Sequence, residues 1–151
     1  MTKEVLISIR GLQIGEDAAN EEEFEQIETI CTGEYFYRNG SHFVLYDELM
    51  EGFEEPCRNM LKFREKEFSQ TRKGPVNVQM VFEDGKKTMT SYVTPFGNIM
   101  MSFDTDVIEI EETEDLIKVH ISYVLEANCQ FVANCNIYVE IKAKESADKT
   151  P

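Results

Sequence analysis

Hydrophobic and polar residues alternate with a period of two along most of the chain, which is the pattern of half-buried β-strands. The apolar positions are rich in Val, Ile, Phe and Tyr, residue types that pack well on a pleated surface. Strands are therefore predicted to dominate the fold. The ranges that carry the alternation are 5–10, 24–38, 41–50, 57–64, 66–73, 76–83, 87–94, 98–112, 117–125 and 131–141.

Turn residues separate these strands in the manner of antiparallel hairpins. Asn39-Gly40 and Asp84-Gly85 favour type I′ turns, in which both central residues have positive φ. Within the long strand 24–38 we expect a bend at Gly33, because glycine allows close backbone approach.

Two segments depart from simple alternation. In 98–112 the apolar residues change parity, which predicts a β-bulge near 104–107. In 17–30 the pair Ala18-Ala19 and a run of Glu have helical propensity, so a helix is an alternative there. The β-branched residues at the end of that segment argue against extending the helix.

Consecutive strands joined by short turns imply an antiparallel meander, which must close or stack to hide its apolar face and its edges. We predict an all-β fold, namely a closed antiparallel up-and-down β-barrel of about eight strands, with a β-sandwich as the alternative. One domain is expected over 1–143, followed by a frayed polar tail over 144–151.

Charge and composition restrict the function. The 151 residues carry 29 Asp or Glu against 15 Lys or Arg, a formal charge of -14, so binding to nucleic acid or to an anionic membrane is not expected. Ser8 and Arg10 interrupt the apolar residues near the N-terminus, so no signal-peptide core is found, and no apolar run reaches the roughly 18 residues of a membrane span. We therefore expect a cytoplasmic protein whose cysteines are reduced thiols. The cysteines are Cys31, Cys57, Cys129 and Cys135.

Short motifs in the middle of the chain carry a family resemblance. They are Thr71-Arg72-Lys73-Gly74, the segment from Gln79 to Gly85 and the segment from Ser91 to Gly97, supported by Gly33-Glu34-Tyr35 and Tyr46-Asp47-Glu48. On these motifs the chain resembles the YwiB-like family of bacterial proteins. The resemblance implies a calycin-like, lipocalin-like β-barrel over 1–143 in a cytoplasmic protein of uncharacterised function, and it supplies no catalytic residue. The chain departs from the family pattern in 51–60, where a Gly- and Thr-rich stretch is expected, and it has none of the Trp that lipocalins carry near their first strand.

The sequence holds no motif of common catalytic or metal chemistry. CxxC, HExxH, GxSxG, GxGxxG and a complete P-loop are all absent, and the two histidines lie on different predicted strands. The acidic run 104–115 does not fit an EF-hand, because the sixth position counted from Asp104 is Glu109 where glycine is required. We predict no metal, no cofactor and no catalytic residue. An enzymatic function is therefore only the third hypothesis, after the two that are described below.

Alternation places two opposite charges inside the predicted barrel. Tyr46 and Glu48 share the apolar face of strand 41–50, and Gln70 and Arg72 share that of strand 66–73. Because an unpaired buried charge is costly, Glu48 and Arg72 should pair with each other or with a ligand.

The first functional hypothesis is a binding barrel that takes a small anionic or amphipathic ligand at one mouth, with Arg72 as the anchor of the anion. The expected ligand-binding residues are Tyr46, Glu48, Arg72, Met80, Phe82, Tyr92 and Thr94. The open alternative is that the same polar groups fill a barrel too narrow for any ligand.

The second hypothesis is a protein-interaction module without a ligand. The segment from Arg58 to Lys73 carries six Lys or Arg against two Glu in an otherwise acidic chain, so it could attract an acidic partner. The same charges could instead pair with acidic neighbouring strands.

Overall fold

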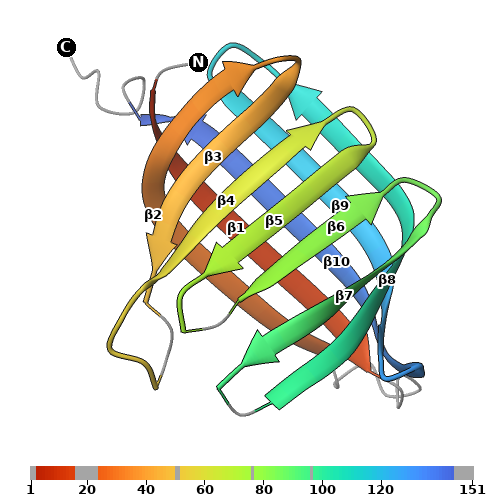
Figure 1. Ribbon diagram of the computed structural model, residues 1–151. Helices are drawn as coiled ribbons and strands as arrows, with labels where there is room; N and C mark the ends of the chain where they lie inside the picture. Colours follow the sequence, from red (N-terminus) through yellow and green to blue (C-terminus); the bar gives the residue numbers. More distant parts are fainter. Residues whose placement is uncertain (1–2, 16–23, 50–51, 76, 96, 145–151) are drawn as a thin grey trace.

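The computed structural model describes residues 3–15, 24–49, 52–75, 77–95 and 97–144, and all of its regular elements are β-strands apart from one helical residue at 144. The strands form one antiparallel sheet in the order β6-β5-β4-β3-β2-β1-β10-β9-β8-β7, which curls into a nearly closed barrel (Figure 1). Their bounds are β1 (Glu4–Gly15), β2 (Phe24–Arg38), β3 (Ser41–Glu48), β4 (Cys57–Arg64), β5 (Glu67–Lys73), β6 (Val78–Glu83), β7 (Lys87–Thr94), β8 (Gly97–Glu112), β9 (Leu116–Ala127) and β10 (Gln130–Ala143).

The prediction of an all-β antiparallel barrel is confirmed, but the expected number of about eight strands is wrong, because the barrel has ten. Short strands explain the difference. β5 has seven residues and β6 has six, and turns of a few residues join them to their neighbours, so 151 residues suffice for ten strands.

The helical alternative for 17–30 is wrong where the structure describes it. Residues 24–30 form the beginning of β2 and pair with β1, from Phe24 opposite Ile14 to Ile30 opposite Ser8. The neighbouring backbone of β1 supplies hydrogen-bond partners that outweigh the modest helical propensity of this segment. The rest of the segment, 17–23, lies outside the described residues.

The two Asx-Gly turns differ. Asn39 and Gly40 have φ of 53° and 79°, which confirms the type I′ hairpin between β2 and β3. At the second turn only Gly85 has positive φ, at 73°, so the type I′ prediction for Asp84-Gly85 is wrong.

The Asp84-Gly85 turn departs from the predicted type because it docks on β8. Gly85 N–H donates to the Thr105 carbonyl at 3.0 Å, and Thr105 N–H donates to the Lys86 carbonyl at 3.0 Å. The Asp84 carboxylate accepts from Ile108 N–H at 3.0 Å, just beyond the bulge between Thr105 and Val107 that the parity change predicted. The turn therefore supplies hydrogen bonds to the part of β8 that extends past its partner β7.

The edges of the sheet meet at β6 and β7. Within the described residues, the backbone pairing at this seam is limited to one bridge, between Asn77 just before β6 and Val93 of β7. Its two backbone hydrogen bonds measure 3.0 and 3.1 Å. The Thr88 hydroxyl donates to the Val81 carbonyl across the same seam. These contacts hold the two edges together without a continuous ladder.

Aromatic side chains fill the middle of the barrel. Phe68 contacts Phe63 and Phe82 with ring centroids 5.6 and 6.3 Å apart, and Phe82 contacts Phe103 and Tyr123 at 4.9 and 4.8 Å. All five rings are buried and come from five strands on both sides of the seam, namely β4, β5, β6, β8 and β9. On β10, continuous alternation over 131–141 would point Phe131 inward with Ala133 and Cys135, but the register shifts between Phe131 and Ala133 and leaves Phe131 exposed.

β2 is a curved strand (Figure 1), and Gly33 allows it to lie close to β1 and β3. A Cβ atom there would lie 2.7 Å from Ile7 Cδ1 and closer still to the Leu45 carbonyl oxygen. Gly11 on β1 differs, because a Cβ atom there would meet nothing within 4 Å.

We predict that Gly33→Ala lowers the free energy of unfolding by about 1–3 kcal/mol, because the backbone oxygen cannot move aside without disturbing the sheet. Gly11→Ala is the matched control and should change stability by no more than about 1 kcal/mol. Urea denaturation of both variants tests this, and equal midpoints would contradict it.

A buried histidine joins strands at the end of the barrel near the chain termini. His42 Nδ1 lies 2.8 Å from the Tyr35 hydroxyl, and its Nε2 lies 3.5 Å from the Glu112 carboxylate of β8. Burial lowers the pKa of His42 below the ordinary 6.5, and the nearby Glu112 carboxylate opposes this shift only in part.

The protein should therefore lose stability as the pH falls below about 6.5, because His42 binds a proton more readily in the unfolded chain than in the folded one. His42→Gln removes this titration. Urea denaturation from about pH 7.5 to 5 measures the unfolding free energy of both proteins. The value for the wild type should fall relative to that for the variant as the pH is lowered. A pH-independent difference would show that His42 does not titrate differently in the two states.

Candidate functional site

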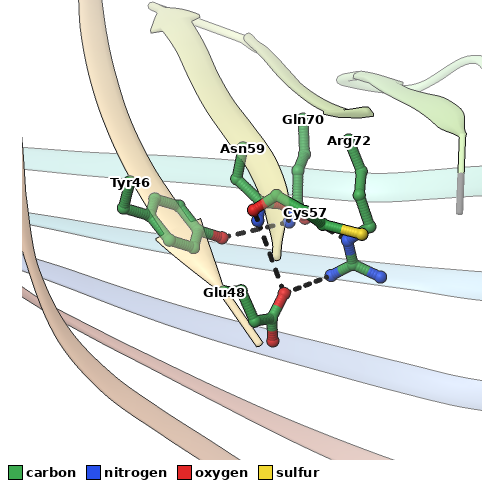
Figure 2. A network of polar contacts seen from close by, with 6 residues as sticks. All are labelled: Tyr46, Glu48, Cys57, Asn59, Gln70 and Arg72. Atoms are coloured by element: carbon green, nitrogen blue, oxygen red, sulfur yellow. Dashed lines mark hydrogen bonds and ion pairs between the residues drawn. The ribbon is translucent and has the colours of Figure 1, made fainter. Parts of the chain in front are cut away.

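A polar network lies inside the barrel, at the end of the strands opposite the chain termini. Tyr46 and Glu48 come from β3, Asn59 from β4, and Gln70 and Arg72 from β5 (Figure 2). Their strands pair so that Asn59 lies opposite both Tyr46 and Arg72. Alternation therefore aims all five side chains into the interior, next to the apolar core.

The predicted pairing of the two interior charges is confirmed. An Arg72 Nη2 donor lies 3.1 Å from Glu48 Oε1, and Arg72 Nε donates to Asn59 Oδ1 at 3.2 Å. The Arg72 and Glu48 side chains are only 16% and 25% exposed. Each charge is thus largely removed from water and compensated by the other.

Asn59 connects this ion pair to the rest of the network. It is completely buried, and its side-chain nitrogen donates to Glu48 and to the Cys57 carbonyl, each at 3.5 Å. Gln70 Nε2 donates to Asn59 Oδ1 and to the Tyr46 hydroxyl, each at 3.1 Å. Because a buried amide needs several partners, Asn59 holds β3, β4 and β5 in one arrangement at this mouth.

Sequence reasoning did not assign Asn59 and Gln70 to the site. Asn59 is a polar residue at an inward position of β4, between Cys57 and Leu61, and this signal could have identified it. The strand pattern already placed Gln70 on the same inward face as Arg72, but no functional role was predicted for Gln70.

A cavity of about 200 Å³ lies against the network. Tyr46, Glu48, Gln70 and Arg72 line one side of it, and residues of the first two strands and of β9 and β10 line the other. The second group comprises Ile9, Gly11, Thr29, Tyr123, Cys135, Asn136 and Ile137. At roughly 30 Å³ for each water molecule, the space equals about six or seven waters, which is less than the usual site of a drug-sized ligand.

Three further predicted site residues do not line this cavity. Phe82 is only 1% exposed and belongs to the aromatic core. Met80 packs against that core opposite Gln70, and Tyr92 lies half-buried on β7 opposite Ile99. The side chain of Thr94 lies outside the described part of the chain. Strand alternation gave Met80, Phe82 and Tyr92 inward positions, but the cavity is lined by residues of other strands, and Met80 packs against the core although it lies opposite Gln70.

The groups around the cavity favour binding over nucleophilic chemistry. Burial raises the pKa of the Tyr46 hydroxyl, which therefore stays a neutral hydrogen-bond donor and acceptor. Burial and, secondarily, Glu48 raise the pKa of the Cys31 thiol, and burial raises that of Cys135. Such shifts oppose formation of the thiolate, which is the nucleophilic form.

The structure leaves all four cysteines as free thiols. Among the described residues, no three His, Cys, Asp or Glu side chains come together in a way that could hold a metal ion. Within the same residues no helix has the length and apolar character needed to cross a membrane.

A larger open hollow of about 390 Å³ lies on the outer face of the barrel, over β1, β2, β8, β9 and β10. Its aromatic and charged groups already contact each other. The His120 ring stacks on the Tyr138 ring with centroids 4.5 Å apart, and His120 Nε2 lies 2.9 Å from Asn136 Oδ1. The guanidinium carbon of Arg10 lies 4.8 Å from the centroid of the Tyr138 ring. The cavity inside the barrel, which brings two opposite charges to one wall, is the stronger candidate site.

The basic side chains of the β4–β5 hairpin lie mainly on the outer surface. Arg58, Lys62, Arg64 and Lys73 are exposed, whereas Arg72 points inward. Arg64 forms a surface ion pair with Glu67 at 3.1 Å, and Lys62 lies 5.6 Å from the centre of the Phe43 ring.

Comparisons with known proteins relate the chain to a family without an assigned activity. The family model described as "Domain of unknown function (DUF1934)" matches residues 7–139. A crystal structure of the ywiB protein from Bacillus subtilis has a TM-score of 0.71, with 23% sequence identity over 95% of this chain and 94% of that chain. At this identity the likeness shows the fold alone. A search of curated proteins finds no match.

The interior ion pair leads to a prediction about stability. Glu48→Gln and Arg72→Gln should each lower the free energy of unfolding by about 1–3 kcal/mol, because each leaves one largely buried charge without its partner. The double variant should cost less than the sum of the two by about 1 kcal/mol or more.

The same cycle on the exposed pair Arg64 and Glu67 is the matched control, with an expected coupling of at most about 0.5 kcal/mol. Guanidinium or urea denaturation of both cycles measures the two couplings. Equal coupling energies would show that burial adds nothing to the Glu48–Arg72 pair.

Proposed function

The chain belongs to the DUF1934 family of domains of unknown function, as its resemblance to the YwiB-like family indicated, and we propose that its barrel binds a small ligand whose anionic group contacts Arg72 in the interior cavity. The observation that carries this proposal is a largely buried guanidinium group at the wall of a cavity inside the barrel. Arg72 has five N–H donors, and its contacts with Glu48 and Asn59 engage only two of its nitrogens. The remaining donors suit a carboxylate or a similar planar anion.

The opposite wall favours a ligand with a short apolar part. Ile9, Ile137 and Cys135 face the cavity across from the polar network. A volume of about 200 Å³ limits the whole ligand to a few non-hydrogen atoms beyond its anionic group. This supports a small amphipathic anion and disfavours a long-chain lipid.

We also propose a calycin-like classification, which the up-and-down strand order supports, and a cytoplasmic setting, which cysteines without disulfides support. The rival function, a protein-interaction module that uses the hairpin from Arg58 to Lys73, is supported by the exposure of Arg58, Lys62, Arg64 and Lys73 on the outer surface.

We expect 3-methylbutanoate, a short branched carboxylate, to bind the wild-type protein at millimolar concentration. In ¹H–¹⁵N NMR spectra at about 150 mM salt, where long-range repulsion from the acidic chain is screened, saturable shift changes should centre on Ile9, Tyr46 and Arg72. Changes on the outer face only, or no saturable change, would contradict the proposal and favour the rival.

Gly11→Val tests the cavity itself while leaving the ion pair intact. A Cβ atom at Gly11 meets nothing within 4 Å, and Gly11 lines the cavity, so the valine side chain should occupy ligand space without strain. The affinity for 3-methylbutanoate should fall at least about tenfold. The control variant Arg64→Gln changes a residue of the outer surface, away from the cavity, and should bind 3-methylbutanoate as tightly as the wild type does.

A further inference from the structure

We propose that the ligand is a small zwitterion of the α-amino acid type, whose carboxylate contacts Arg72 while its ammonium group contacts Glu48. This inference rests on the proposed function, because it assigns the class of ligand to the same cavity. It adds a recognition role for Glu48 as the residue that selects for a positive charge.

Among the described residues, each interior charge has polar atoms that no other residue contacts. Figure 2 shows one Glu48 carboxylate oxygen receiving the contacts from Arg72 and Asn59, while the other oxygen points away from the network without a dashed line. One terminal nitrogen of Arg72 is likewise directed away without a partner among the described residues. A strong acceptor and a strong donor therefore lie next to each other at the cavity wall.

Charge balance favours a ligand with both signs. Glu48 and Arg72 are the only ionised side chains among the described residues that line the cavity, and together they are neutral. A ligand with an anion alone would add a net negative charge next to Glu48, and this repulsion would weaken its binding. A zwitterion leaves the cavity neutral and offers each protein charge a new partner.

The remaining groups match the other parts of such a ligand. The Tyr46 hydroxyl accepts a hydrogen bond from Gln70, so its own proton remains to be donated, and a ligand carboxylate next to Arg72 would accept it. Ile9 and Ile137 provide an apolar wall for a short aliphatic side chain. The volume of about 200 Å³ has room for a small aliphatic amino acid.

Three ligands of matched shape test the inference on the wild-type protein. They are L-valine, 3-methylbutanoate, which lacks the amine, and 2-methylpropylamine, which lacks the carboxylate. NMR titration should show L-valine binding at least about tenfold more tightly than either analogue, because each charged group adds a charge-assisted hydrogen bond in the cavity.

The variant Glu48→Gln provides the specific control, and its thermal unfolding and NMR spectrum report whether it is folded. In this variant the preference for L-valine over 3-methylbutanoate should fall to about twofold or less, and 3-methylbutanoate should bind as tightly as before or more tightly. Arg64→Gln, on the outer surface, should keep the full preference.

The results separate this inference from the proposed function. Equal binding of L-valine and 3-methylbutanoate to the wild type would overturn the zwitterion inference and leave the anion site at Arg72 standing. A preference for L-valine that persists in folded Glu48→Gln would also overturn it. Equal binding of 2-methylpropylamine and L-valine, or no binding of any of the three, would overturn both.

Discussion

The antiparallel pairing of β1 with β10 is the interaction on which the rest of the structure depends. It joins the first strand to the last, from Val5 opposite Ala143 to Gly15 opposite Ala133, and so connects a sheet of six strands with a sheet of four. A meander without this pairing would leave two apolar faces in water and would add the long edges of β1 and β10 to those of β6 and β7. Because the partners are separated by nearly the whole chain, closing this loop is also the costliest ordering step of the fold.

The candidate site exists only because that pairing is made. Its polar wall comes from β3 and β5, near the middle of the six-strand part, while Cys135 and Ile137 of its apolar wall come from β10. Ile9 on β1 lies between the two parts. A cavity assembled across the closure makes ligand binding and barrel stability parts of the same equilibrium, since a ligand that binds only the folded state stabilises that state.

The interior changes character along the barrel. Stacked aromatic rings fill its middle, whereas Asn59 gathers two charges and two further polar groups at one mouth. A charged pair in this place is no simple source of stability, because its desolvation offsets much of its attraction. Its presence in a barrel that could be filled by apolar side chains is consistent with the proposed recognition of a polar ligand.

The sequence by itself determined the strands, most turns, the bulge in β8 and the inward direction of Glu48 and Arg72, because each follows from the order of residues along one short segment. Only the tertiary structure decided that ten strands close the barrel, that the Asp84-Gly85 turn docks on β8, and that Asn59 is the centre of the network. It also decided which inward residues share a cavity, bringing Tyr46 to it while placing Phe82 in the core. Alternation states which face a side chain occupies, but the distance across a barrel depends on strand number, register and tilt, which arise from contacts between segments far apart in the chain.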